Sequence, residues 1–308
     1  MHSPDRSTRR PANRQLMPPF LSPGDQISVV APCGSLSLSQ LESLEHGVKI
    51  WRDRGYKLDR PEFAAWGYLA GRDDQRRSQL LAAWQDPNTT AILVAKGGYG
   101  AMRLLEQWSW QELAPKWLIG FSDVTALLWS MAASDRAGGL HGDLLTTLAT
   151  QPPWVIEQMF GWLEGKLPQV TLAGQGWGGG KGQGKLLAAN LNLATHLIGT
   201  PHFPAWQKPI LAIEEVGELP YQVDRMLTHW RLTGLIQQLG GIALGRFSHP
   251  PLTKPSLTMT EVLRDRLGDL NIPIVADLPF GHQGENAPLP LGYLVELDGD
   301  LGTLTIRS

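Results

Sequence analysis

Short apolar runs that alternate with helix-like segments constrain the fold of this chain more than any other feature. The runs Ala91 to Ala95 (AILVA) and Trp117 to Phe121 (WLIGF) contain no polar residue, and Gln26 to Ala31 (QISVVA) is a third strand candidate. Strands buried on both faces form continuous apolar runs, and alternation with helices is typical of a parallel sheet covered on both sides. We therefore predict an α/β fold whose N-terminal domain holds a parallel, Rossmann- or flavodoxin-like sheet.

The second half of the chain predicts a mixed α/β domain. We expect helices from Leu187 to Ile198 and from Tyr221 to Leu232, and strands from Pro209 to Glu214 and from Gly241 to Phe247. Near the end, Asp298-Gly299 lies between two strand-like runs and indicates a β-hairpin.

The pattern breaks between the two halves. Residues 151–184 contain Pro152-Pro153 and the glycine-dense stretch AGQGWGGGKGQG from Ala173 to Gly184. Glycine and proline clusters of this kind mark loops and junctions. The predicted organisation is a flexible tail over 1–19, an N-terminal α/β domain over 20–150, a linker with a Gly-rich loop over 151–184, and a C-terminal domain over 185–308.

Charge and cysteine content argue against several functional classes. Lys and Arg total 27 against 29 Asp and Glu, which gives a net charge of -2. The chain therefore lacks the excess of basic residues that is typical of nucleic-acid-binding proteins, and we expect no nucleic-acid partner. Cys33 is the only cysteine, and there is no HExxH motif, so a zinc hydrolase has little support. No apolar run reaches membrane-spanning length and none reads as a signal peptide, so we expect a cytoplasmic protein.

Ser122 and Asp123 lie at the seam between an apolar run and the helix-like run Val124 to Met131. A serine on a strand-to-helix turn has backbone N–H groups and a helix N-terminus beside it, which suits a nucleophilic hydroxyl. Ser and Asp are also preferred helix caps. The hydrolase elbow G-x-S-x-G is incomplete, because Val124 replaces its second glycine. Taken alone, this seam favours the capping interpretation.

A nucleophilic serine needs a base that is itself oriented by an acid. His141 (GGLHGD) and His282 (PFGHQGEN) lie in glycine-flanked loops beyond predicted strands, where functional side chains are often presented. Glu214 directly follows the apolar run PILAI and is the first candidate for the acid, with Glu215 and Glu218 as alternatives. A surface acid at the edge of a strand would give the same pattern.

The loop Gly97-Gly98-Tyr99-Gly100 follows the run AILVAK. Neither the P-loop nor the dinucleotide-binding motif is complete there, so a nucleotide site has little support. Glycines would let backbone N–H groups approach a developing oxyanion, and they would equally suit a tight turn.

Six blocks of sequence, in order, resemble the LD-carboxypeptidase family of serine peptidases. They span about Pro23 to Ile306. The blocks are AKGGYGAMRLL (Ala95 to Leu105), GFSDVTALL (Gly120 to Leu128), LHGD (Leu140 to Asp143), AANLNLATHLIGTP (Ala188 to Pro201), LAIEEVGELPYQVDRML (Leu211 to Leu227) and LPFGHQGENAPLPLG (Leu278 to Gly292).

This resemblance implies a Ser-Glu-His triad and an N-terminal parallel domain that carries the serine. Ser122 matches the nucleophile, Glu214 the acid and His282 the base, while Glu215 stays open as the acid. Backbone N–H groups of Asp123 and of Gly98, or Gly97, would stabilise the oxyanion. The implied reaction releases the terminal D-alanine from murein tetrapeptide, in cell-wall recycling, through an acyl-enzyme and without a metal or cofactor.

The implied substrate has a free carboxylate, which needs a cation. Lys96 and Arg103 are candidates for this cation, and Gly97 and Tyr99 share the same loop. Either charge could equally be a solvated one at the start of a helix. Trp177 is a candidate aromatic lid, although an incidental tryptophan in a flexible linker fits equally well.

The sequence departs from the family's pattern at three places. Lys96 stands where arginine is common, Asp143 replaces a common proline, and Ala188-Ala189 stand where glycines are usual. The alternatives are a relative of the microcin C resistance peptidases, which cleave an aminoacyl-nucleotide amide, and a non-catalytic ligand-binding protein on the same scaffold. The sequence leaves a homodimer open.

Overall fold

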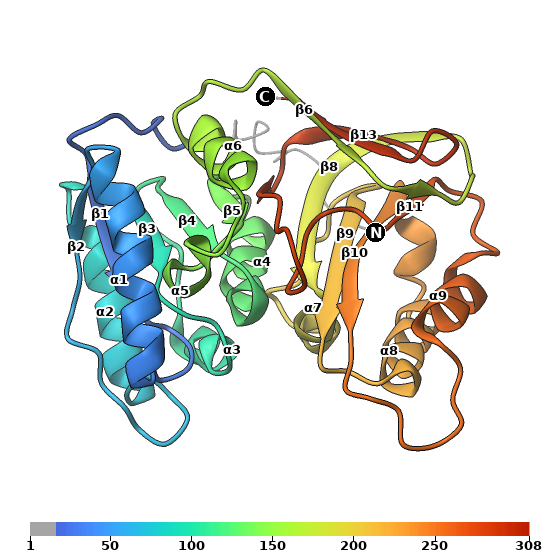
Figure 1. Cartoon of the computed structure of the whole chain (residues 1–308), viewed down its shortest axis with the longest axis horizontal. Helices are drawn as coiled ribbons and strands as arrows, with labels where there is room; N and C mark the ends of the chain where they lie inside the picture. The colour runs from blue at the N-terminus through green and yellow to red at the C-terminus, as the bar shows by residue number, and fades with distance from the viewer. Residues whose placement is uncertain (1–16, 308) are drawn as a thin grey trace, which may run out of the picture.

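The computed structural model describes residues 17–307, which form two α/β units built on two sheets that lie side by side (Figure 1). Each sheet belongs mainly to one half of the chain. The predicted fold class, a parallel N-terminal sheet followed by a mixed C-terminal unit, is confirmed. Most of the predicted tail over 1–19 lies outside the described residues.

The first sheet has the strand order β12-β5-β4-β3-β1-β2, and its strands from β2 to β5 run parallel. The order 2-1-3-4-5 is that of flavodoxin-like doubly wound sheets, which bind ligands at the carboxyl ends of their strands. The strands are β1 (Gln26–Val30), β2 (Lys57–Asp59), β3 (Thr89–Val94), β4 (Trp117–Gly120), β5 (Gly139–His141) and β12 (Leu289–Pro290).

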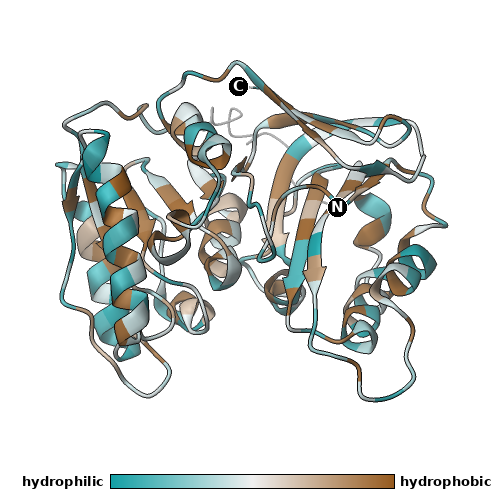
Figure 2. Ribbon diagram, viewed as in Figure 1, coloured by the Kyte–Doolittle hydropathy of each residue, from teal (hydrophilic) through white to brown (hydrophobic). Residues whose placement is uncertain are grey.

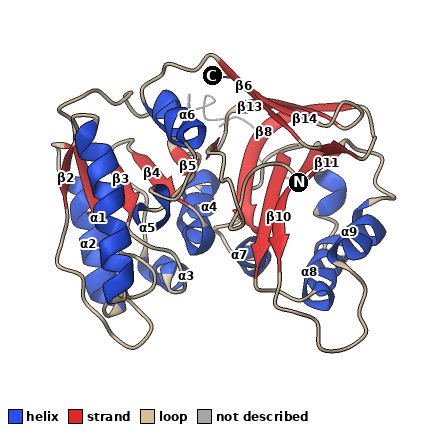
Figure 3. Cartoon of the chain, viewed as in Figure 1, coloured by secondary structure: helices blue, strands red, loops and turns tan. Residues whose placement is uncertain are grey.

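Helices cover both faces of this sheet, as Figure 3 shows. Alternate residues of β1 face opposite sides, so Ile27 and Val29 join the core beneath α1, while Val30 joins the core on the other side. Helix α1 begins at a capping box in which Ser37 and Gln40 each bond the other's backbone N–H. The helices are α1 (Leu38–Asp53), α2 (Asp73–Gln85), α3 (Ala101–Leu104), α4 (Thr125–Ala133), α5 (Leu145–Leu148) and α6 (Pro153–Leu163).

The second sheet has the order β6-β14-β13-β8-β9-β10-β11-β7, with β8 to β11 parallel and its other pairings antiparallel. The hairpin expected around Asp298-Gly299 is present as the pair β13–β14. Its elements are β6 (Gln169–Ala173), β7 (Gln175–Gly176), β8 (Lys181–Asn190), α7 (Leu191–Leu197), β9 (Ile210–Val216), α8 (Pro220–Leu232), β10 (Gly241–Ser248), α9 (Met259–Leu267), β11 (Ile274–Ala276), β13 (Leu294–Asp298) and β14 (Thr303–Arg307).

The Gly-rich stretch differs from the predicted loop, because much of it is strand. A Cβ at position 182 would lie 2.3 Å from the Gly240 carbonyl oxygen, and one at position 184 would lie 2.3 Å from that of Lys208. These glycines therefore allow close approach of neighbouring backbone rather than flexibility.

The predicted helix from Leu187 to Ile198 is also corrected. Strand β8 continues to Asn190, and α7 begins at Leu191 because the Asn190 side chain caps it by accepting from Leu193 N–H. Residues Leu187 to Ala189 are buried on both sides, and such a strand cannot be told from a helix by its apolar pattern.

The two units share one continuous hydrophobic core. Helix α4 contacts α7 and β8, and Trp129 Nε1 donates to the Ala188 carbonyl oxygen across the boundary at 2.8 Å. Figure 2 shows the hydrophobic strands of the first sheet and the mixed character of α1. Strand β12 comes from the C-terminal half and completes the first sheet, with Leu289 opposite His141. Within residues 17–307, no helix combines the length and the apolar character needed to cross a membrane.

Candidate active site

Ser122 lies on a sharp turn between β4 and the helical segment that leads into α4. Its φ of 64° is in the left-handed region, which non-glycine residues rarely occupy and which costs about 1–3 kcal/mol. Neither Ser122 nor Asp123 makes the side-chain hydrogen bond of a helix cap, so the capping interpretation is wrong. The turn instead projects the Ser122 hydroxyl into a pocket.

The structure brings Ser122, His282 and Glu214 together in one hydrogen-bonded row. Ser122 Oγ lies 2.9 Å from His282 Nε2, and His282 Nδ1 lies 2.6 Å from Glu214 Oε2. Glu214 is fully buried, while the side chain of His282 keeps 19% of its surface exposed. In the tautomer protonated at Nδ1, the imidazole donates to Glu214 and its Nε2 accepts from the serine hydroxyl.

Glu214 and Glu215 both lie within β9, so their side chains point to opposite faces. Glu215 faces the pocket and accepts from Asn190 Nδ2 at 3.1 Å and from Asn192 N–H at 2.7 Å. Burial raises the pKa of Glu215 to about 7, although these hydrogen bonds act to lower it. The structure thus brings Glu214, and not Glu215, to His282.

Three residues that the sequence did not single out hold this row in place. Asn286 Oδ1 accepts from Gly281 N–H at 2.9 Å and so fixes the residue before His282. The ring of Phe121 packs against the imidazole of His282, with centroids 4.7 Å apart. Asn190 Nδ2 lies 3.4 Å from Glu214 Oε1. Their only sequence signal is adjacency to a candidate residue or to a strand end.

The glycine loop after β3 lies against Ser122. A Cβ on Gly97 would lie 3.3 Å from Ser122 Oγ, and Gly98 lines the same pocket as Ser122. The carboxylate of Asp123 is buried and accepts from Ala101 N–H at 2.8 Å, although burial raises its pKa. Asp123 thereby ties the glycine loop to the turn that carries the serine.

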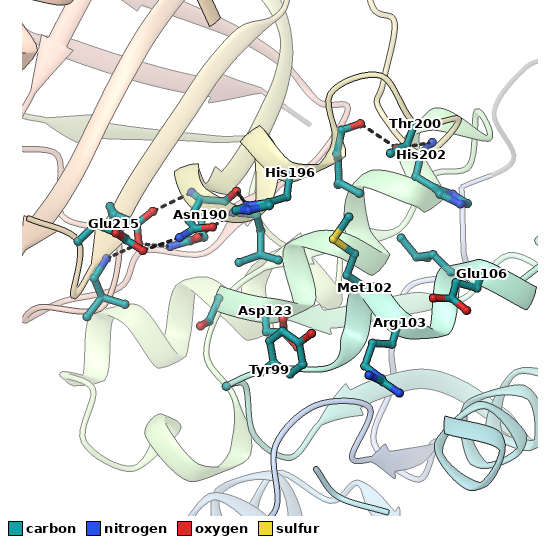
Figure 4. Close-up of a pocket in the computed structure, with 18 of the residues that line it drawn as sticks. Tyr99, Met102, Arg103, Glu106, Asp123, Asn190, His196, Thr200, His202 and Glu215 are labelled. Atoms are coloured by element: carbon teal, nitrogen blue, oxygen red, sulfur yellow. Dashed lines mark hydrogen bonds between the residues drawn. The ribbon is translucent and has the colours of Figure 1, made fainter. Parts of the chain in front are cut away.

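The pocket is a cavity of about 770 Å³ between the two units, within the usual range for small-molecule sites. Tyr99, Arg103 and Asp123 line it from the first unit (Figure 4). Asn190, His196 and Glu215 line it from the second.

Of the two predicted cations, the structure brings only Arg103 to the pocket. Arg103 also pairs with Asp73, with Nη2 2.6 Å from Oδ2, and this arginine lowers the pKa of Asp73 to about 2. Lys96 does not line the pocket, because its Nζ donates to the Ser35 carbonyl oxygen at 2.6 Å.

Trp177 does not line the pocket, so the predicted aromatic lid has no support in this arrangement. Its backbone N–H donates to the Ile274 carbonyl oxygen at 2.9 Å. Its ring packs under the guanidinium of Arg264, 4.2 Å from the ring centroid. Trp177 is therefore held at the β7–β11 edge of the second sheet.

His141, the other candidate base, is fully buried between Phe121 and Phe280 and makes no hydrogen bond to Ser122. Burial, and then the nearby charge of His282, lower its pKa to about 3, so its imidazole is neutral. No group of three or more metal-ligating side chains occurs in the described part of the chain.

A serine, a histidine and a glutamate joined in this way on an α/β scaffold form the arrangement of serine-type hydrolases. Comparison with known proteins identifies the family within this class. Residues 27–142 match the LD-carboxypeptidase N-terminal domain, and residues 183–297 match the LD-carboxypeptidase C-terminal domain. The chain belongs to the LD-carboxypeptidase family.

Relatives are similar over nearly their whole length. A Synechocystis sp. protein named provisionally as a carboxypeptidase is 52% identical, over 94% of this chain and 97% of its own. The murein tetrapeptide carboxypeptidase of Pseudomonas aeruginosa is 30% identical, over 95% of this chain and 98% of its own.

Solved structures have the same fold. The muramoyltetrapeptide carboxypeptidase from Oxalobacter formigenes superimposes with a TM-score of 0.82 at 25% identity, over 92% of this chain and 99% of its own. The microcin C7 self immunity protein MccF superimposes with a TM-score of 0.84 at 21% identity, over 95% of this chain and 98% of its own.

Proposed function

We propose that this chain is a serine carboxypeptidase that hydrolyses the L,D-peptide bond of murein tetrapeptide and releases the terminal D-alanine. The observation that carries the proposal is the bridging position of His282, 2.9 Å from Ser122 Oγ and 2.6 Å from Glu214 Oε2. Family membership supports the reaction class, and the name of the Pseudomonas aeruginosa relative supports the substrate.

In this proposal His282 Nε2 takes the proton of Ser122 as the hydroxyl oxygen attacks the carbonyl carbon of the scissile bond. Glu214 orients the imidazole and stabilises its cation. The protonated imidazole then donates its proton to the leaving amine of D-alanine, and an acyl-enzyme remains on Ser122. His282 next removes a proton from water as the water oxygen attacks the ester carbonyl carbon. The imidazolium then returns that proton to Ser122 Oγ as the ester bond breaks, which releases the tripeptide and restores the serine.

The oxyanion formed in each step needs donors that are already in position. The proposed donors are the backbone N–H groups of Asp123, directly after the nucleophile, and of Gly98, which lines the pocket beside Ser122. The hydrogen bond from Ala101 N–H to the Asp123 carboxylate supports this assignment, because it couples the two segments that carry these donors.

Arg103 is the proposed partner of the substrate's free carboxylate. It lines the pocket with Ser122, and its side chain is 37% exposed, so part of the guanidinium can face a ligand while another part pairs with Asp73. Tyr99, which also lines the pocket and is 53% exposed, offers an aromatic surface at its mouth.

The test is mass spectrometry of murein tetrapeptide after incubation with the wild-type protein and with Ser122→Ala. We expect the wild type to yield tripeptide and free D-alanine, and the variant to lose turnover by at least about three orders of magnitude. A Glu214→Gln sample serves as a second variant with the serine intact.

An aminoacyl sulfamoyl nucleoside incubated in parallel separates the substrate classes, since MccF was solved with such a compound. Preferred cleavage of the nucleoside would contradict the murein assignment while keeping the serine chemistry. Absence of turnover of either compound by a folded wild-type protein would favour a non-catalytic ligand-binding role.

A further inference from the structure

Arg103 is the end of a row of ion pairs that joins α3 to α2. Its Nε donates to both carboxylate oxygens of Asp73 at 3.0 Å, and its Nη2 donates to Oδ2 at 2.6 Å. Asp73 Oδ1 also accepts from Nη2 of Arg76, one turn further along α2. Asp73 therefore lies between two arginines, and this ion-pair row carries one more positive than negative charge.

Arg76, at the inner end of the ion-pair row, bonds the backbone of three separate segments. Its side chain is 1% exposed. Nη1 donates to the carbonyl oxygens of Pro32 and, at 2.9 Å, of Gly100, while Nε donates to that of Gly71 at 3.2 Å. The guanidinium is planar and its donors have a fixed geometry, so these bonds fix the three segments relative to one another.

The bond to Gly100 connects the ion-pair row to the turn that carries Ser122. Gly100 ends the glycine loop, and a Cβ there would lie 2.8 Å from Arg76 Nη1. The next backbone N–H, that of Ala101, donates to the carboxylate of Asp123 at 2.8 Å. The peptide group between Gly100 and Ala101 is thus held by Arg76 on one side and by the residue after Ser122 on the other.

The outer end of the ion-pair row lines the pocket. Arg103 is 37% exposed, and it is the one lysine or arginine among the described residues around this cavity. Neither Asp73 nor Arg76 lines the cavity. A carboxylate bound at Arg103 would therefore extend the alternation of charges by one anion, and guanidinium groups bind carboxylates through paired N–H donors.

We propose that Asp73 and Arg76 are positioning residues for the recognition of a substrate carboxylate by Arg103. Asp73 holds the guanidinium of Arg103 at Nε and Nη2. Arg76 joins Asp73 to the glycine loop, so the position of the bound carboxylate is fixed relative to Ser122. This inference rests on the proposed function, because it assigns both residues to the binding of the same substrate.

Asp73 also has a simpler role, since it begins α2 and an acidic residue in the first turn stabilises a helix. That role alone predicts that Asp73→Asn loses stability and keeps its choice of ligand. Positioning predicts a changed choice. Without the negative charge between them the two guanidinium groups repel each other, and Arg103 is no longer held in place.

The test measures binding by calorimetry to the full chain carrying Ser122→Ala, which separates recognition from hydrolysis. The two ligands are murein tetrapeptide and the same peptide with a C-terminal carboxamide. We expect the free acid to bind about 10- to 100-fold more tightly than the amide. Adding Asp73→Asn should reduce this preference at least about 5-fold, through weaker binding of the acid.

Asp269→Asn is the matched control for Asp73→Asn. Asp269 accepts from Arg231 Nη1 at 2.7 Å and from its Nη2 at 2.6 Å, and neither residue lines the pocket. We expect this variant to keep the full preference for the free acid.

Arg76→Lys tests the inner end of the ion-pair row. A lysine keeps the charge but lacks the planar fork that bonds Asp73 and the backbone together, so the preference should fall about 2- to 5-fold. Arg231→Lys is its control, because Arg231 likewise bonds an aspartate and, at 2.8 Å, the carbonyl oxygen of Arg266.

Asp73→Glu decides the matter if the other variants do not fold. It keeps the acidic charge at the start of α2 and moves the carboxylate, so the preference should still fall. An unchanged preference in the folded variants at positions 73 and 76, an equal loss in the controls, or no binding of either peptide overturns the inference. The proposed function fails separately, if the wild-type protein releases no D-alanine from tetrapeptide.

Discussion

Gly281 lies directly against Glu214. A Cβ atom at position 281 would lie 2.8 Å from Cβ of Glu214 and 3.1 Å from its Oε2, and the φ of Gly281 is +114°. The loop that carries His282 can therefore cross β9 closely only because this residue has no side chain. The distance between imidazole and carboxylate depends on that close approach.

Gly281→Ala should therefore displace Glu214 from His282. We expect a loss of about 1–3 kcal/mol in the free energy of unfolding from the strained φ and the contact, together with a loss of activity. Denaturant titration and the rate of tetrapeptide hydrolysis measure the two effects. Gly284→Ala is the matched control, since its φ is +79° and nothing lies within 4 Å of the added Cβ. Equal activity in both variants would argue against the contact.

Glu214→Gln should lower kcat by about 10³- to 10⁴-fold, because an amide cannot stabilise the imidazolium and favours the wrong tautomer. Glu215→Gln should leave the reactivity of Ser122 intact, since Glu215 bonds Asn190 and Asn192 and not His282. Single-turnover kinetics of both variants would show the contrast. The assignment of the acid would be reversed if Glu215→Gln were the more damaging change.

Ser122→Gly should be more stable than Ser122→Ala. The left-handed backbone at φ 64° costs an L-residue about 1–2 kcal/mol, and the greater freedom of glycine in the unfolded chain removes up to about 1 kcal/mol of that gain. The expected difference is therefore about 1 kcal/mol and at most about 2 kcal/mol, measured by thermal unfolding of the two variants side by side. A more stable alanine variant would mean that the turn relaxes without the hydroxyl.

Glu215 should make stability depend on pH. Its folded-state pKa is raised to about 7 by burial, so its contribution to stability is fully present below its unfolded value of about 4.5 and is lost as pH rises through about 7. Glu215→Gln should therefore gain stability relative to the wild type between pH 5 and pH 8. Unfolding curves at several pH values would show this trend, and a difference that is constant with pH would contradict it.

The fold was largely predictable because its signals are local. The runs around β3 and β4 are apolar, short and bounded by turns, which fixes their type and order. The Gly-rich segment was wrongly predicted as a loop, because glycine serves both flexible loops and close backbone packing. Gly176, whose Cβ would lie 2.3 Å from the Gly299 carbonyl oxygen, is there for close packing between segments far apart in the chain.

The site was predictable only where the family pattern identifies single residues. Ser122, Glu214 and His282 come from three such blocks, and the structure joins them. The supporting contacts of Phe121, Asn190 and Asn286 depend on how two units pack, which local periodicity does not encode. Trp177 illustrates the same limit. Its place in the Gly-rich stretch suggested a lid over the ligand, whereas its contacts beside β7 and with Arg264 hold it away from the pocket.

The most direct test of the account is covalent labelling of the folded protein with a fluorophosphonate, followed by peptide mapping. We predict one adduct, on Ser122, that is absent in Ser122→Ala and forms at least about 10²-fold more slowly in His282→Ala, because the hydroxyl then lacks its base. An adduct on another residue, or an unlabelled Ser122 in protein that still releases D-alanine from tetrapeptide, would contradict the claim that His282 activates this serine.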